Sequence, residues 1–193
     1  MNKKEKIVIA VLAIVALLVT LVIGIFSGYN SAKKADSKLN VSSVEDLTTL
    51  VDKIYEGVTV QMPAVETQAL ETTNVDVVKS FTGLDNTEDI EYLVVSEPMM
   101  SSQAYSLVLV KVKNGANAND IAKTMNENID ARKWICVSAE KVYTTTSGDV
   151  ICLVMSNEET AKAVYESFKT LAGSVGKEYA RAEEEPELPP EMF

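Results

Sequence analysis

The strongest constraint in this sequence is an uninterrupted apolar segment near its start. Residues 7–26 (IVIAVLAIVALLVTLVIGIF) contain no charged side chain, and only Thr20 and Gly24 fall outside the apolar set. As an α-helix, twenty residues span about 30 Å, which is the thickness of the hydrocarbon core of a bilayer. The segment therefore predicts a transmembrane helix whose partner is the lipid bilayer.

The charges beside this segment predict its orientation. Three of the residues 1–6 are lysines, so the positive-inside rule places 1–6 in the cytoplasm and the rest of the chain outside. Lys33, Lys34 and Lys38 weaken this assignment without reversing it. A cleaved signal peptide with a site near Ala32 is the alternative, but its apolar core is typically only about 7–15 residues long. The length favours an uncleaved signal anchor in a single-pass protein of the cell membrane.

Charge and composition exclude several classes of function. Beyond the apolar segment, 15 basic and 27 acidic residues give residues 27–193 a net charge of −12, which opposes binding to nucleic acid. The chain has no histidine, so it has no Ser-His-Asp triad, Cys-His dyad or histidine metal site. Catalysis by carboxylates, lysine or cysteine stays open. No catalytic residue, cofactor or metal ligand is predicted, because no calcium loop or glycine-rich phosphate loop is found.

Hydrophobic periodicity predicts the fold of the remainder. Residues 27–41 are predicted to be a tether, and residues 42–175 are predicted to form an extracytoplasmic α+β domain. Strand patterns cover 92–95, 104–113, 140–146 and 149–155, and helices follow the capping residues Ser42 or Ser43, Asn74, Asn117 or Asn119, and Asn157. This order predicts a four-stranded, mostly antiparallel sheet (ββαββα) with packed helices, preceded by the single N-terminal transmembrane helix. Residues 176–193, rich in glutamate and proline, predict a disordered acidic tail.

Three residues are candidates for a binding lip. Met99 and Met100 precede the best strand, and methionine side chains adapt to varied ligands. Trp134 is the only tryptophan and offers a face for stacking on a sugar or peptide. For all three the structural interpretation is favoured: a loop between strands with one methionine in the core, and a tryptophan packed where helix meets sheet.

The two cysteines admit three interpretations. Outside the membrane Cys136 and Cys152 could form a disulfide, but they could also be small buried hydrophobic residues or, least expected, a reactive thiol. A tight turn at Ser147-Gly148 places Cys152 opposite Tyr143, seven positions from Cys136. Cross-strand pairing is not expected, because bridged Cα atoms lie within about 7 Å.

Two stretches of the chain resemble a known family. Residues 88–115 (EDIEYLVVSEPMMSSQAYSLVLVKVKNG) and residues 148–169 (GDVICLVMSNEETAKAVYESFK) are similar to a family of uncharacterised extracytoplasmic domains of Gram-positive bacteria, classed as a domain of unknown function. Its members are often lipoproteins or single-span proteins. The resemblance implies a surface-anchored domain and supplies no catalytic residues. This chain lacks the modified cysteine of the lipoprotein members.

The sequence thus predicts a membrane-anchored, non-enzymatic binding module of the bacterial cell envelope with a protein or peptide partner. An envelope enzyme using carboxylates and an assembly factor for a membrane complex are the alternatives. Two carboxylates converging on one concave pocket would favour the enzyme. A flat sheet face with exposed apolar residues would favour protein binding.

Overall fold

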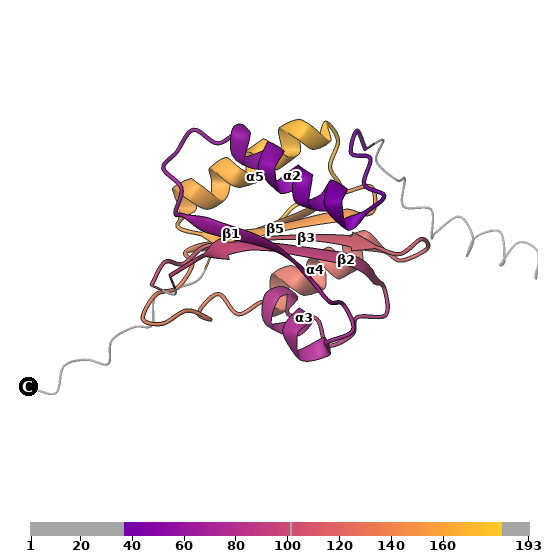
Figure 1. Cartoon of the computed structure of the whole chain (residues 1–193), viewed down its shortest axis with the longest axis horizontal. Helices are drawn as coiled ribbons and strands as arrows, with labels where there is room; N and C mark the ends of the chain where they lie inside the picture. Colours follow the sequence, from indigo (N-terminus) through magenta and orange to yellow (C-terminus); the bar gives the residue numbers. More distant parts are fainter. Residues whose placement is uncertain (1–36, 101, 183–193) are drawn as a thin grey trace, which may run out of the picture. The chain divides into compact units, whose positions relative to one another are not determined.

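The computed structural model describes residues 37–100 and 102–182, which form one antiparallel sheet with helices on both faces (Figure 1). The six strands lie in the order β1-β2-β3-β5-β4-β6. Their bounds are β1 Val65–Leu70, β2 Ile90–Pro98, β3 Ser106–Val112, β4 Lys141–Ser147, β5 Val150–Ser156 and β6 Tyr179–Ala182. The α+β class is confirmed, and the predicted four-stranded sheet is wrong.

The four predicted strands are the four inner ones. β3 and β5 are buried at every residue, because helices cover both faces of the sheet there. They pair antiparallel, with Leu109 opposite Cys152. β4 and β5 form a hairpin whose turn contains Gly148 at a φ of +63°, a left-handed conformation that glycine adopts without steric cost.

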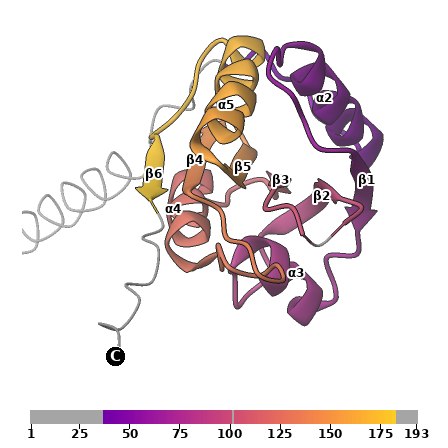
Figure 2. The ribbon, with the colours of Figure 1, turned by 90° about the vertical axis from the view of Figure 1, so that its left-hand side faces the viewer.

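The two strands that the sequence did not predict are the edges of the sheet, visible at opposite sides of Figure 2. β1 pairs with β2 from Val65–Pro98 to Leu70–Leu93, and its side chains alternate only partly between covered and exposed positions. Such a half-covered edge strand leaves a weak apolar pattern.

The other edge corrects the predicted tail. β6 pairs with β4 and lies within residues 176–193, so disorder is the wrong prediction for the start of that segment. Tyr179 packs against the core there, and the Arg181 guanidinium donates a hydrogen bond to the Ile129 carbonyl at 2.7 Å. Residues 183–193 lie outside the described part of the chain.

The helices divide into two layers. In chain order the bounds are α2 Val44–Glu56, α3 Val75–Thr82, α4 Ala118–Asn128 and α5 Glu158–Ala172. α2 and α5 cover one face, and α3 and α4 cover the other (Figure 1). The predicted asparagine caps hold for α3, α4 and α5, while the capping box of α2 joins Ser43 to Asp46. Neither sheet face is the flat exposed surface that would favour protein binding.

No helix within residues 37–100 and 102–182 has the length and apolar character needed to cross a membrane. The predicted transmembrane segment, residues 7–26, lies outside the described residues. Its insertion and its cleavage stay predictions from the sequence.

Candidate functional site

Two of the three predicted lip residues border the same cavity. Met99, at the end of β2, and Trp134, in the loop after α4, line an open pocket of about 620 Å³. Pockets of this volume hold small-molecule or side-chain ligands. Met100 is also exposed but is not among the residues that line the pocket, so the interpretation that placed one of the two methionines in the core is wrong. Trp134 packs against the core, as its structural interpretation predicted.

The pocket forms where two helices end. Gly83 closes α3 with a φ of +72°, and a methyl group added at its Cα would lie 2.5 Å from the Ile129 nitrogen and 2.6 Å from the Asn128 carbonyl carbon. Only a glycine therefore lets the end of α3 approach the end of α4 this closely. The C-terminal ends of both helices meet at the pocket wall.

Lys133 is the central charged group of the site, and we call the cavity the Lys133 pocket. Its ammonium forms an ion pair with Glu97 and lies 4.5 Å from the centre of the Phe81 ring and 5.4 Å from that of the Trp134 ring. These distances fall in the range of cation–π interactions. Burial lowers the pKa of Lys133 below its ordinary value of 10.5, although the Glu97 carboxylate opposes that shift.

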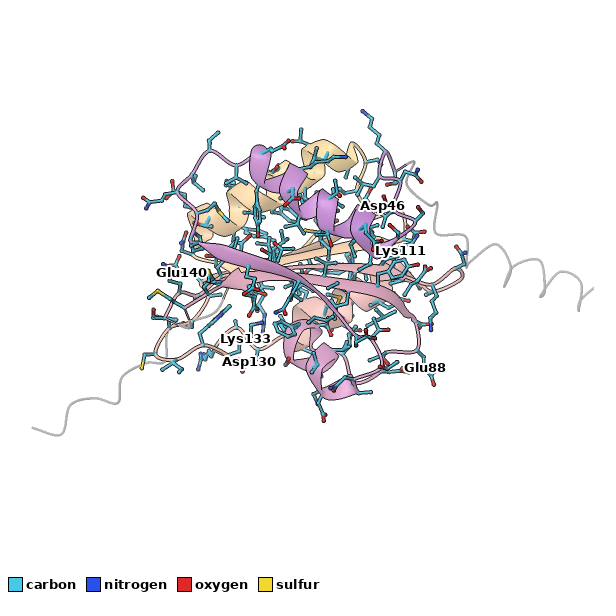
Figure 3. The ribbon with its side chains drawn as sticks, viewed as in Figure 1. Asp46, Glu88, Lys111, Asp130, Lys133 and Glu140 are labelled. Atoms are coloured by element: carbon cyan, nitrogen blue, oxygen red, sulfur yellow. The ribbon has the colours of Figure 1, made fainter. Side chains whose placement is uncertain are left out.

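A second carboxylate, that of Asp130, lines the same pocket. Figure 3 shows Asp130 and Lys133 near each other on the α3 side of the sheet. The Asp130 Oδ1 atom accepts a hydrogen bond from the Arg132 backbone nitrogen at 2.8 Å, which fixes the turn that leads to Lys133. Both carboxylates of the pocket therefore have partners that hold them in place.

A further lysine, Lys79 of α3, also lines the pocket, but its ammonium forms an ion pair with Asp85 at 2.6 Å. Both groups are largely exposed, so this pair contributes little to stability. Hence the positive charge of Lys79 is balanced locally.

Three exposed apolar residues line the pocket or adjoin a lining residue in the sequence. Met99, Met100 and Ile135 are three of the four large apolar residues exposed in the described part of the chain. Ile135 follows Trp134 directly, and Met99 lines the same pocket as Trp134. Apolar surface beside a few charged groups is typical of a site that orients a ligand.

Neither cysteine is among the residues that line the Lys133 pocket. Cys136 is exposed at a φ of +63°, Cys152 is buried in β5, and both are free thiols. The disulfide that the sequence left open is absent between these two described residues. Burial raises the pKa of the Cys152 thiol far above its ordinary value, which makes it an unreactive core residue.

The sequence did not indicate Lys133, Glu97, Phe81 or Asp130 as site residues. These side chains come from α3, β2 and the loop after α4, so only the fold brings them together. The one local signal was Lys133 beside the only tryptophan.

No protein-family model, curated protein or solved structure matches the chain. The resemblance to the Gram-positive extracytoplasmic family stays a prediction from the sequence.

Proposed function

We propose that this chain is a non-enzymatic binding module of the cell envelope whose ligand enters the Lys133 pocket. The observation that carries the proposal is the composition of the pocket, which combines aromatic and thioether surfaces with a fixed ion pair. Such sites use the apolar walls for affinity and a few polar groups for orientation. A partner protein or peptide of the envelope would place a side chain in the pocket and contact the exposed Met99 that lines it.

The envelope location rests on the sequence alone. The apolar residues 7–26, the acidic remainder of the chain and the resemblance to extracytoplasmic domains support it. Anchoring through residues 7–26 remains a prediction about a segment that the structure does not describe.

A carboxylate-based enzyme is the second candidate, because Glu97 and Asp130 line one pocket. Glu97 forms an ion pair with Lys133, and Asp130 accepts a hydrogen bond from the backbone of a turn. Both carboxylates therefore have a structural role. A binding function is compatible with both interactions, whereas general acid–base catalysis would require one carboxylate to leave its partner and exchange a proton with the substrate. Conversion of a bound compound that is lost in both Glu97→Gln and Asp130→Asn would favour the enzyme.

The single tryptophan supplies a direct test. Trp134 lines the pocket, so its fluorescence reports occupancy of that pocket without a label. Full-length protein in detergent would be titrated with low-molecular-weight fractions of a Gram-positive envelope, including peptides released from the cell wall. We expect at least one fraction to change the emission saturably.

Two variants of α3 control this measurement. Ser80 lines the pocket and is exposed, so Ser80→Tyr should fill the entrance and abolish the change. Val75, exposed on the same helix but not among the pocket residues, gives the matched Val75→Tyr control, which should behave as the parent protein. A saturable change that Ser80→Tyr leaves intact, or no change with any fraction, would contradict the proposal.

A further inference from the structure

We propose that the Lys133 pocket is selective for a cationic group, an ammonium or guanidinium, presented by a small amine or by a basic side chain of a peptide. This inference rests on the proposed binding function and adds the chemical class of the ligand. Four properties of the described residues carry it: the aromatic faces, the carboxylates, the helix ends and the lysine already present.

The aromatic faces favour a positive charge. Phe81 and Trp134 both present their rings to the Lys133 ammonium, at 4.5 and 5.4 Å from the ring centres. The negative face of an aromatic ring attracts cations and repels anions. Two rings directed at one point form the walls of a cation site.

The carboxylates supply the counter-charge. Glu97 contacts the Lys133 ammonium through Oε1, and a carboxylate accepts hydrogen bonds at both of its oxygens. Asp130 adds a second negative charge to the lining. An incoming anion would meet both carboxylates, while an incoming cation would find acceptors on both.

The helix ends act in the same direction. The C-terminal end of an α-helix carries a partial negative charge, and the ends of α3 and α4 meet at Gly83 beside the pocket. A cation from another part of the chain is already bound nearby, since the Arg181 guanidinium donates to the Ile129 carbonyl just after α4. The whole chain, with a net charge of −10, attracts cations from a distance as well.

Lys133 occupies the cation site from within the chain. It lies in the loop between α4 and β4, and its ammonium sits on the aromatic faces with Glu97 as its partner. Burial makes the charged form of this lysine costly, as its lowered pKa indicates. A ligand cation therefore competes with Lys133 for Glu97, and the displaced ammonium regains hydration in the solvent.

The opposite role, in which Lys133 attracts an anion, predicts the opposite mutational result. Lys133→Ala removes a competitor if the pocket takes cations, and it removes the recognition group if the pocket takes anions. This variant therefore distinguishes the two charge classes by the direction of the change in affinity.

The test uses full-length protein in detergent and follows the emission of Trp134. The probes are propylammonium, which matches the atoms lost in Lys133→Ala, with propanol as the neutral control and propionate as the anionic one. N-acetyl-lysine methylamide and a lysine-containing tripeptide distinguish a small amine from a peptide as the source of the cation.

We expect propylammonium to bind Lys133→Ala at least tenfold more tightly than the parent protein, with no saturable response to propanol or propionate. Lys111→Ala, which removes a lysine of another buried ion pair, should leave the affinity for propylammonium unchanged. Asp130→Asn, whose side-chain oxygen can still accept from the Arg132 nitrogen, should weaken binding of every cationic probe severalfold.

Propionate binding that disappears in Lys133→Ala would overturn the inference and leave the pocket a binding site for anions. A failure of all three cationic probes in both the parent protein and Lys133→Ala would also overturn it. The titration with envelope fractions, which assumes no ligand charge, would then decide the proposed binding function separately. If Lys133→Ala fails to fold, the comparison of the parent protein with Asp130→Asn still tests the cation preference.

Discussion

Two lysine–carboxylate pairs of similar burial occur in this molecule, and they differ in what surrounds them. Lys111 pairs with Asp149 at 2.5 Å, with the side chains 11% and 27% exposed. Lys133 pairs with Glu97, with the side chains 16% and 23% exposed. Lys111 and Lys133 are well separated in Figure 3, on opposite sides of the sheet.

The surroundings of Lys111 are regular secondary structure. Lys111 belongs to β3, opposite Val150 of β5, and Asp149 lies in the adjoining hairpin turn. The Asp149 carbonyl also accepts a hydrogen bond from the Val112 nitrogen at 2.9 Å. Lys133 lies instead in a loop, between aromatic rings and an open pocket. Burial of an ion pair is therefore not enough to identify a binding site, because both pairs are similarly buried. The Lys133–Glu97 pair is the candidate because it borders an open pocket.

Replacing one glycine beside each lysine–carboxylate pair by alanine tests this contrast most strongly. Gly83 adjoins the Lys133 pocket, and Gly115 follows β3 near Lys111; both have positive φ angles. Gly83→Ala should lower the free energy of unfolding by about 2–4 kcal/mol, because left-handed strain adds to overlap with the end of α4.

Gly115→Ala is the matched control, since a methyl group there would have no neighbour within 4 Å. It should cost about 1–2 kcal/mol from backbone strain alone. Chemical denaturation followed by circular dichroism measures both values. Equal losses would mean that the two helix ends are not tightly packed at the pocket.

Replacing each lysine by methionine compares the two pairs directly. Lys111→Met removes the ammonium that pairs with the half-buried Asp149 carboxylate in the hairpin turn, and should lower the free energy of unfolding by about 1–3 kcal/mol. Lys133→Met should cost less than about 1 kcal/mol, because methionine packs well against Phe81 and Trp134 and the Glu97 carboxylate lines an open pocket where water solvates it. Denaturation curves provide the measurement, and a larger loss for Lys133→Met would make its pair the structural one.

The same contrast explains what the sequence could predict. β3 and β5 are covered on both faces, so their nearly continuous apolar runs predicted strands correctly. β1 and β6 lie at the edges, where few apolar side chains are needed, and their patterns were too weak to identify. The helix caps were local signals, and the observed N-cap of each of the four described helices was among the residues predicted for it.

The site was predicted less well for a physical reason. Met99 was a candidate because methionine adapts to varied ligands, and Trp134 because it is the only tryptophan of the sequence. Glu97 and Lys133 are common residue types separated by 36 positions, and their ion pair depends on how β2 and the loop after α4 come together. Local sequence patterns carry no information about such a long-range contact.

Titration of Lys133 should change the free energy of unfolding by less than the substitutions above, and only the Lys133 pocket should show this effect. Its pKa lies below 10.5 because burial outweighs the opposing charges of Glu97 and Asp130. The unfolded chain then holds this proton more tightly, so the contribution of Lys133 to the free energy of unfolding rises as pH increases from the lowered pKa to 10.5.

The expected observation is a change in Trp134 emission in the same pH range, caused by loss of the adjacent ammonium charge. Lys133→Met should abolish this change, while Lys111→Met should retain it. A transition that persists in Lys133→Met would assign the signal to another group.

The smallest expected effect distinguishes Met99, which lines the pocket, from an exposed residue that does not. Met99 is 74% exposed, so Met99→Ala should change the free energy of unfolding by less than about 0.5 kcal/mol. Because Met99 lines the pocket, the same variant should weaken a pocket ligand by about two- to fivefold, which corresponds to partial loss of one apolar contact. Val75→Ala, at an exposed position of α3 that is not part of the lining, is the control and should alter neither quantity. Trp134 fluorescence measures the affinity. An unchanged affinity in Met99→Ala would mean that only the aromatic and charged residues around Lys133 recognise the ligand.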